Sequence, residues 1–525
     1  MRDRASGKAA ALAAWVSALA LAGVVHAATP APAPPPGTDP DTRAWWAITG
    51  ALSGDDMEGR DTGSAAYARA ARYVAGRFKA AGLTPAGDNG GWLQTLPLAE
   101  VKVDKPGTRF DIVRKGGGHT PLVFLHQISV RATDALPSTL DAPLSFRGYC
   151  SRAEMGDNMR GKIAVCFGGR RSGLPGGGER MKAAADAGAA GLIAVDDPGF
   201  TIEPARWPDA YARSVTLRDA PPPAFPTLPV MRLSTGAFAT MLKGSGQDPA
   251  ALLAAGAASK PLPAFDIPAR LQAQLHLSTR QLTSDNVLGL LPGTDPALKP
   301  QVVVVSAHLD GYGFGEAVKG DALYNGAFDD AAYVATLIRM AEQRHGRGFK
   351  RSVLFAAFTG EEKGLLGAVW FTQHPTVPKA DLAADINLDQ LRPLFPLKIL
   401  TMHAVDDTTL GAAARSVAQG MGVEIRPDRE PDRRLVQRAD HWPFLQIGVP
   451  ATGFVFGYDP GTEAERRYRE WYQVRYHRPQ DDMTQPIDFK AAADFNRFFY
   501  TLTATVADDP ARPAFLPGSA LKPKS

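Results

Sequence analysis

Four short apolar runs in the second half of the chain limit its possible folds more than any other feature. They are QVVVVSAHLD (301–310), RSVLFAAFTGEE (351–362), ADINLDQ (384–390) and GVPATGFVFG (448–457). Runs that are apolar on both faces are typical of strands in a sheet that is covered on both sides. Helical patterns over Asp330–Gln343 and Gly364–Thr372 follow the first two runs. The sequence therefore predicts an α/β fold with a central, mostly parallel sheet flanked by helices.

The length of the chain indicates more than one domain. Its 525 residues exceed the roughly 250–300 residues at which a single core stops growing. Between residues 141 and 268 a separate β–α–β pattern appears, in GKIAVCFGG, ERMKAAADAGAAGLIAVDDP and FPTLPVMRLSTGAFATML. We expect this segment to be an inserted, mostly β domain that divides the main domain into residues 41–140 and 269–510. Residues 511–525 would form a C-terminal tail.

The N-terminus has the features of an export signal. Arg2, Arg4 and Lys8 precede an apolar stretch, Ala9–Val25, which ends at small residues. A basic start, a short apolar stretch and small residues are typical of a signal peptide. We predict a signal peptide over residues 1–27, a Pro/Ala-rich linker over 28–40 and a periplasmic or extracellular location. An uncleaved membrane anchor is the alternative, although the stretch is short for a membrane span.

The charge of the chain limits the class of partner, and its cysteine content leaves a possible disulfide undecided. The formal net charge of +4 is spread over the chain without a Lys/Arg run, so nucleic acid is not an expected partner. The two cysteines, Cys150 and Cys166, could form a disulfide in an oxidising compartment. Two buried thiols are the alternative.

Potential metal ligands gather where the predicted strands end. They are His308 and Asp310, Asp329 and Asp330, Glu361 and Glu362, Asp389, and finally His477 near the C-terminus. In open α/β sheets the site lies at the carboxyl ends of the strands, and zinc accepts imidazole and carboxylate ligands. Each residue alone has an ordinary explanation, such as a helix cap, a solvated carboxylate or a core histidine. Together, acidic groups at several buried strand ends would repel one another unless cations neutralised them.

Five of these motifs resemble a known enzyme family. AHLD, GAFDD, TGEEKGLLG, INLDQ and YHRPQDD, in this order, are similar to metallopeptidase family 28, which contains zinc aminopeptidases and glutamate carboxypeptidase-like enzymes. The segment MEGRDTGSAAYARAARYVAGRFKAAGLTPAG resembles the N-terminal signature of exported bacterial members. GKIAVC and AGAAGLIAV give the inserted segment a resemblance to a protease-associated domain.

The resemblance implies a site with two zinc ions. His308 and Asp389 would bind one ion, and Glu362 and His477 would bind the other. Asp329 would bridge the two.

Three further roles follow from the same resemblance. Glu361 would be the general base that takes a proton from the water at the metals. Asp310 would lie behind His308 and fix its tautomer. His441, in ADHWPF (439–444), would bind substrate by donating a hydrogen bond to the developing oxyanion or to a substrate terminus. A structural histidine packed against Trp442 is the alternative for His441.

The resemblance implies a zinc-dependent exopeptidase that acts on peptide substrates through a metal-bridging hydroxide. An aminopeptidase is favoured, and a carboxypeptidase of the same family is an alternative. A glutaminyl cyclase-like transferase with one zinc is another alternative, and a receptor-like relative without activity is a third. We expect no stable membrane anchor. The sequence predicts neither the side-chain preference nor the oligomeric state.

Overall fold

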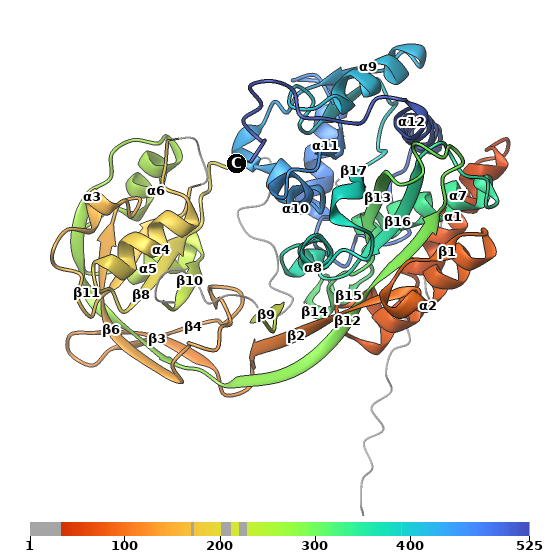
Figure 1. Cartoon of the computed structure of the whole chain (residues 1–525). Coiled ribbons are helices and arrows are strands. Elements are labelled where there is room, and N and C mark those ends of the chain that lie inside the picture. Colours follow the sequence, from red (N-terminus) through yellow and green to blue (C-terminus); the bar gives the residue numbers. More distant parts are fainter. Residues whose placement is uncertain (1–32, 170–172, 201–211, 220–227, 390, 524–525) are drawn as a thin grey trace, which may run out of the picture.

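The computed structural model describes residues 33–169, 173–200, 212–219, 228–389 and 391–523. The predicted signal peptide, residues 1–27, and the first part of the predicted linker lie outside these ranges. Within them, the chain forms two eight-stranded sheets, a three-stranded sheet and a two-stranded hairpin. Figure 1 shows the two large sheets as two bodies, joined by the long strands β2 and β12. None of the described helices has both the length and the apolar character that a membrane span requires.

The first sheet has the strand order β20-β17-β13-β16-β12-β2-β9, and β1 pairs with β12. Its strands are β1 (Thr84–Pro85), β2 (Leu93–Val103), β9 (Ala212–Leu217), β12 (Leu277–Leu291), β13 (Val302–His308), β16 (Ser352–Phe358), β17 (Leu382–Leu388) and β20 (Ala451–Thr452). Strands β20, β17, β13 and β16 are parallel to their neighbours within this group. The remaining strands pair antiparallel. The predicted α/β class is confirmed, with the parallel strands confined to one part of a mixed sheet.

Helices cover both faces of the parallel strands, as the apolar runs predicted. Alternate residues such as Val303 and Val305 pack into a core with α1 (Pro40–Ser53), α2 (Ala65–Ala80), α7 (Ala332–Arg344) and α12 (Phe489–Asp508). Their neighbours Val302 and Val304 pack on the other face with α8 (Leu366–Gln373) and α10 (His441–Gln446). Because successive side chains of a strand point to opposite faces, both sets must be apolar.

Smaller elements complete this first body. A hairpin, β14 (Gly313–Val318) and β15 (Asp321–Tyr324), follows β13. A three-stranded sheet consists of β18 (Ile399–Met402), β19 (Glu424–Arg426) and β21 (Phe454–Phe456). In the sequence, α9 (Leu410–Gly420) lies between β18 and β19, and α11 (Glu463–Val474) follows β21.

The fourth apolar run is not one strand, contrary to the prediction. It is divided into β20, which pairs with β17, and β21, which pairs with β18 in the three-stranded sheet. Gly453 separates the two strands, and a Cβ atom at this position would lie 3.0 Å from Nδ1 of the buried His441. The chain therefore changes sheets at a point where an imidazole leaves no room for a side chain.

The second sheet has the order β4-β3-β11-β6-β7-β8-β10-β5. Its strands are β3 (Arg109–Arg114), β4 (His119–Leu122), β5 (Ile128–Val130), β6 (Thr139–Arg147), β7 (Ile163–Phe167), β8 (Gly191–Val195), β10 (Val230–Leu233) and β11 (Ala264–Gln274). Helices α3 (Arg152–Met155), α4 (Gly177–Asp186), α5 (Thr235–Met241) and α6 (Pro249–Ala257) connect or cover them. A disulfide joins Cys150 to Cys166 in β7, with Cα atoms 5.5 Å apart, which decides the alternative that the sequence left open.

The limits of this second sheet differ from the predicted insertion at 141–268. The sheet begins at β3, because Phe110 and Ile112 alternate into the same core as Leu271 of the partner strand β11. Strand β9, inside the predicted insertion, pairs instead with β2 of the first sheet. Its Val215 and Leu217 are buried in a small cluster with residues of β2 and α8. The segment is therefore bound to the first sheet through one strand rather than wholly separate.

Candidate metal centre

The predicted ligands lie at the carboxyl ends of the parallel strands. His308 is the last residue of β13, and Asp389 directly follows β17. Asp329 lies in the turn of π-helix Ala327–Ala331 that leads into α7, and Glu362 lies in the 3-10 turn Glu361–Lys363 after β16. His477 follows α11. Four separate segments of the first sheet and one C-terminal segment thus meet at one edge.

These side chains form overlapping groups that could hold metal ions. One group is His308, Asp329 and Asp389, and another is Asp329, Glu362 and His477. Within each group the potential ligand atoms lie within 4.8 Å of one another. Asp329 belongs to both: its Oδ1 lies 3.4 Å from Nε2 of His308, and its Oδ2 lies 3.3 Å from Nε2 of His477. The structure thus brings together the five residues that the resemblance implies as ligands, with Asp329 between the two histidines.

The adjacent glutamates face different histidines. Oε2 of Glu362 lies 3.4 Å from Nε2 of His477, whereas Oε2 of Glu361 lies 3.9 Å from Nε2 of His308. Both residues belong to a tight turn between two left-handed glycines, Gly360 (φ 68°) and Gly364 (φ 113°). Such backbone angles favour glycine, and the turn allows neighbouring carboxylates to point toward different parts of the site.

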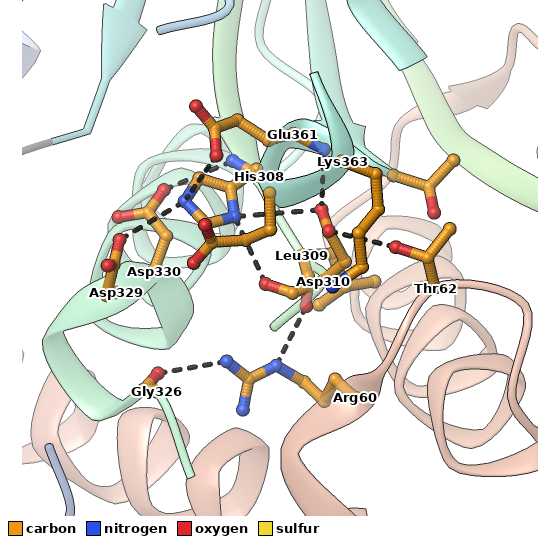
Figure 2. Close-up of polar contacts among 12 residues, drawn as sticks. Arg60, Thr62, His308, Leu309, Asp310, Gly326, Asp329, Asp330, Glu361 and Lys363 are labelled. Carbon is orange, nitrogen blue, oxygen red and sulfur yellow. Dashed lines mark hydrogen bonds and ion pairs between the residues drawn. The ribbon is translucent and has the colours of Figure 1, made fainter. Parts of the chain in front are cut away.

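Asp310 has contacts on both sides of the site (Figure 2). Its backbone carbonyl lies 3.1 Å from Nδ1 of His308, closer than its carboxylate Oδ1 at 3.7 Å. That carboxylate accepts a 3.0 Å hydrogen bond from the backbone N–H of Glu361 and another of 3.0 Å from the hydroxyl of Thr62. Both the carbonyl and the carboxylate of Asp310 thus lie near Nδ1 of His308, and the tautomer role expected of the side chain stays a prediction, while the carboxylate also holds the backbone N–H of Glu361.

The charges of the site are poorly balanced by the protein alone. Burial raises the pKa of Glu361, and nearby Asp389 and Glu362 raise it further. Burial, with the charge of Asp329, raises the pKa of Glu362 to about 6. For His308 burial acts to lower the pKa, but the carboxylates of Glu361 and Asp330 outweigh it and hold the pKa well above its ordinary value.

The unsatisfied atoms fit the requirements of a cation. Nε2 of His308, Oδ2 of Asp329 and Oε1 of Glu362 are buried without a hydrogen-bond partner. Buried charges of this kind are normally paired or coordinate a metal. The donor set of imidazoles and carboxylates is one that zinc accepts, so the residues present fit the ions that the resemblance implies.

A buried arginine that the sequence analysis did not single out supports the backbone around the site. Arg60 is 0% exposed. Its guanidinium donates to the carbonyls of Leu309 (2.8 Å), Asn325 (2.8 Å) and Gly326 (2.9 Å) and to that of Leu52 (2.6 Å). It thus ties the segment after β13 to the segment before Asp329. Arg60 lies within the N-terminal signature MEGRDTG, which is the one sequence signal that could have indicated its importance.

A second buried arginine, Arg392, contacts the shared carboxylate. Its Nη2 lies 3.5 Å from Oδ1 of Asp329, and its Nη1 donates to the carbonyl of Phe328 at 3.0 Å. Its guanidinium stacks over the ring of Trp471 at 4.5 Å. On the other side, Asp481 accepts the N–H of Phe328 at 3.0 Å. The backbone just before Asp329 is therefore held from both sides.

Two tyrosines frame the predicted ligand His477. The hydroxyl of Tyr312 lies 3.2 Å from Nδ1 of His477, and the ring of Tyr476 stacks on the imidazole with centroids 3.7 Å apart. Tyr312 directly precedes the hairpin β14–β15 and was not singled out in the sequence. These contacts orient the imidazole toward Asp329 and Glu362.

His441 lies outside the potential ligand groups. It is fully buried at the start of α10, and its ring stacks on His403 with centroids 5.0 Å apart. Burial lowers the pKa of both imidazoles, that of His403 to about 4, so both are neutral near pH 7. The preceding Asp440 is buried close to Asp310 and Asp389, whose charges add to burial in raising its pKa. The predicted substrate contact of His441 therefore stays a prediction.

Comparison with known proteins finds a family model that matches the part of the chain containing the site. Residues 286–503, which include every one of these potential ligands, match the family model described as Peptidase family M28. The segment that carries the candidate site is thus similar to peptidase family M28.

Curated relatives match this chain over part of their length. Leupeptin-inactivating enzyme 1 of Streptomyces exfoliatus is 23% identical over 239 residues, which cover 44% of this chain and 50% of that protein. Aminopeptidase YwaD of Bacillus subtilis is 25% identical over 207 residues, which cover 38% of this chain and 40% of that protein. The chain therefore spans half the length, or less, of these curated relatives.

Solved structures of two aminopeptidases share the fold over almost the whole chain. An aminopeptidase from Aneurinibacillus sp. strain AM-1 matches with a TM-score of 0.59 and 18% identity, covering 93% of this chain and 97% of that one. BSAP, described as a zinc aminopeptidase from Bacillus subtilis, matches with a TM-score of 0.54 and 19% identity, covering 90% and 96%. Coverage this large includes most of the second sheet, so the two-sheet architecture is common to these proteins.

Proposed function

We propose that this chain is a two-zinc exopeptidase that removes residues from the N-terminus of peptides. The observation that carries the proposal is the position of Asp329, whose two carboxylate oxygens each face a different histidine at 3.3–3.4 Å. A carboxylate placed in this way can bridge two ions, and two-metal hydrolases hold their ions roughly 3.5–4 Å apart.

Each ion would have its own ligands besides the shared carboxylate. His308 and Asp389 would complete one site, and Glu362 and His477 the other. When bound, the two ions lower the pKa of a coordinated water to about 7 and polarise the carbonyl of the scissile bond. The names of the similar aminopeptidases, one of them described as a zinc enzyme, support zinc as the metal and the N-terminus of a peptide as the target.

Glu361 is placed to move the proton. Its carboxylate lies near His308 but is not needed for either ligand pair, and its backbone N–H is held by Asp310. A carboxylate in this position accepts a proton from the attacking water and returns it to the leaving amine. The surroundings are buried, so bulk water is largely excluded and the electrostatic interactions between the site and the substrate are strengthened.

A transferase of the single-zinc glutaminyl cyclase type is the weaker candidate. The presence of both ligand pairs and of a shared Asp329 supports two ions rather than one. A carboxypeptidase would use the same ligands, and the aminopeptidase relatives favour the N-terminal specificity.

Export and domain type are also parts of the proposal. We infer that residues 1–27 direct the chain out of the cytoplasm, and the Cys150–Cys166 disulfide supports an oxidising compartment because disulfides persist there. We further infer that the second sheet, with its short glycine-bounded strand β7, is a protease-associated domain.

Metal content and substrate choice test the proposal together. The purified protein should contain close to two zinc ions per chain by elemental analysis, lose activity on chelation and regain it with added zinc. It should hydrolyse aminoacyl chromogenic substrates and leave N-blocked dipeptides intact. One ion per chain with full activity would contradict the two-zinc proposal, and selective cleavage of N-blocked dipeptides would indicate a carboxypeptidase.

A further inference from the structure

A charged cavity of about 610 Å³ lies between the first sheet and the second. Strands β2, β9, β12 and β14 and a loop of the second sheet line it. The lining residues are Glu100, Lys102, Val103, Asp104, Lys105, Pro106, Leu125, Arg213, Ser278, Arg280, Phe314, Gly315 and Glu316. Its volume lies within the range of about 300–1,000 Å³ that is usual for ligand sites. None of its lining residues is a potential metal ligand.

The cavity adjoins the metal centre through one hairpin. Tyr312 and Tyr324, at the two ends of the hairpin β14–β15, line the small hollow that contains Asp329, Glu362 and His477. Phe314–Glu316 of the same hairpin line the larger cavity. Figure 1 shows β14 beside β2, β9 and β12, where the two bodies meet. A chain leaving the metal centre past this hairpin would therefore enter the cavity.

Ion pairs form a second connection between the two hollows. Arg213, on the cavity wall, pairs with Asp61, which also lies 3.4 Å from Nζ of Lys363. Lys363 follows Glu362 in the sequence and stacks over the ring of Tyr312 at 4.6 Å. These contacts fix the wall of the cavity relative to the turn Glu361–Lys363, which contains the predicted ligand Glu362.

The most exposed charges that line the cavity are positive. The side chain of Glu100 is 6% exposed and that of Glu316 is 16% exposed, so both carboxylates lie in the wall. Their partners Arg280 and Lys105 are each 58% exposed. Lys102 is 47% exposed and lies 3.4 Å from the carboxylate of Asp104, which is 33% exposed. Because each ammonium or guanidinium has several N–H donors, a cation paired on one side still presents donors to a ligand. The ring of Phe314, on a residue 61% exposed, adds an apolar surface beside them.

We propose that this cavity binds a carboxylate on the part of the peptide substrate that follows the scissile bond. Arginine and lysine recognise carboxylates through charge-assisted hydrogen bonds, and Arg280 and Lys102 supply them here, while the adjoining residue packs on Phe314. The proposal rests on the proposed exopeptidase function and names its preferred substrates: peptides with an acidic side chain downstream, or short peptides whose free C-terminus reaches the cavity. In both cases the group bound by Arg280 and Lys102 is a carboxylate.

The double variant Lys102→Gln/Arg280→Gln tests this site. Glu100 keeps Arg213 as a partner at 2.5 Å when Arg280 is replaced, so no carboxylate is left buried and unpaired. The matched control is Lys490→Gln/Arg497→Gln, which removes two exposed cations of α12 that pair with Asp494. kcat/KM would be measured on four substrates: an aminoacyl chromogenic amide, a neutral amidated peptide, the same peptide with downstream Asp residues, and the same peptide with a free C-terminus.

The expected result is selective. The variant should lose roughly tenfold in kcat/KM on one or both of the carboxylate peptides, the scale of a lost hydrogen bond to a charged group. It should be unchanged on the chromogenic amide and the neutral peptide. Loss on the Asp peptide alone identifies the side chain as the ligand, and loss on the free-C-terminus peptide alone identifies the terminus.

Other outcomes overturn the inference. Equal loss on all four substrates, no loss on either carboxylate peptide, or the same loss in the α12 control would each do so. If the unmodified protein with zinc cleaves none of the substrates, the proposed exopeptidase function fails instead, and the two failures are therefore distinguishable.

Discussion

Buried charged side chains have different hydrogen-bond partners in the two large sheets. In the second sheet, the buried Arg180 donates to the carbonyls of Tyr149 (3.1 Å) and Gly169 (2.7 Å), so its hydrogen bonds stay within the protein. At the candidate metal centre of the first sheet, buried atoms of the predicted ligands His308, Asp329 and Glu362 have no hydrogen-bond partner. The candidate site of the first sheet thus contains buried charged atoms that no hydrogen bond satisfies, whereas the buried Arg180 of the second body is satisfied by carbonyls of that body.

This difference separates a functional region from a supporting one. Burying uncompensated carboxylates reduces the free energy of unfolding. Such a loss is tolerated where the free energy of binding a ligand offsets it. The second sheet is instead fastened by the disulfide between Cys150 and Cys166. Substitutions in the first sheet should therefore change metal binding and catalysis, and those in the second should change stability.

The largest effect is expected from Asp329→Ala. Because this carboxylate faces both histidines, its loss removes a ligand from both sites. Zinc content should fall well below two ions per chain and hydrolysis should fall to background, as measured by elemental analysis and steady-state kinetics. Asp266→Ala is the control in the second sheet, where the side chain is 55% exposed and its carboxylate pairs with Arg147 and Lys162 and accepts a hydrogen bond from Ser145, and it should keep both zinc and activity. Retention of two ions by Asp329→Ala would break the contrast between the sheets.

Adjacent glutamates should respond differently to the same substitution. Glu361→Gln removes a base without removing a ligand, so kcat should fall by at least about 100-fold while KM and zinc content stay near those of the unmodified protein. Glu362→Gln weakens a ligand, so it should lose zinc and be partly rescued by excess metal. Kinetics and metal content measured on both variants decide the assignment, and it is reversed if Glu361→Gln is the variant that loses zinc.

A smaller effect is expected from Arg392→Lys. The substitution keeps a positive charge but loses the fork that reaches both Asp329 and the carbonyl of Phe328. Residues that orient a ligand typically contribute 10–100-fold to metal affinity or activity, so zinc affinity should fall within that range in a competition titration with a chelator. Excess zinc should restore most of kcat. The matching Arg180→Lys variant of the second sheet should leave zinc affinity unchanged, and an equal change in both would argue for a general structural effect.

The smallest effect on hydrolysis is expected from removing the disulfide. Cys150→Ser/Cys166→Ser opens a link between residues 16 apart in sequence, and closing a loop of about this length contributes roughly 3 kcal/mol. Thermal or denaturant unfolding should show this loss, while kcat on an aminoacyl chromogenic amide stays unchanged below the transition. A large fall in kcat at low temperature would show that the second sheet is more tightly coupled to the metal centre than its bonding indicates.

Sequence patterns predicted the parallel strands of the first sheet well, because the apolar composition of these strands indicates that both of their faces are buried. Val302–Val305 and their counterparts are apolar on both faces, which only a covered sheet permits. The gathering of His308, Asp329 and Glu362 was predictable for a related reason, since the carboxyl ends of parallel strands meet at one edge.

What the sequence did not reveal depends on distant partners. Arg60 and Arg392 resemble surface residues in the sequence, and only the fold shows that they bind carbonyls and a carboxylate in the interior. Strand β9 could not be assigned to the first sheet, because its pairing with β2 joins segments more than a hundred residues apart. The division of the fourth run at Gly453 depends on the side chain of His441, which no local pattern shows.

The position of Arg60 has a consequence for the order in which the enzyme is made. This residue leaves the ribosome early, yet three of its four carbonyl partners lie at residues 309, 325 and 326, and the ligand His477 follows still later. No partly synthesised chain therefore possesses the complete centre. If the export that we propose carries the chain out while it is being made, the centre would be completed only outside the cytoplasm, away from the proteins of the cell that produces it.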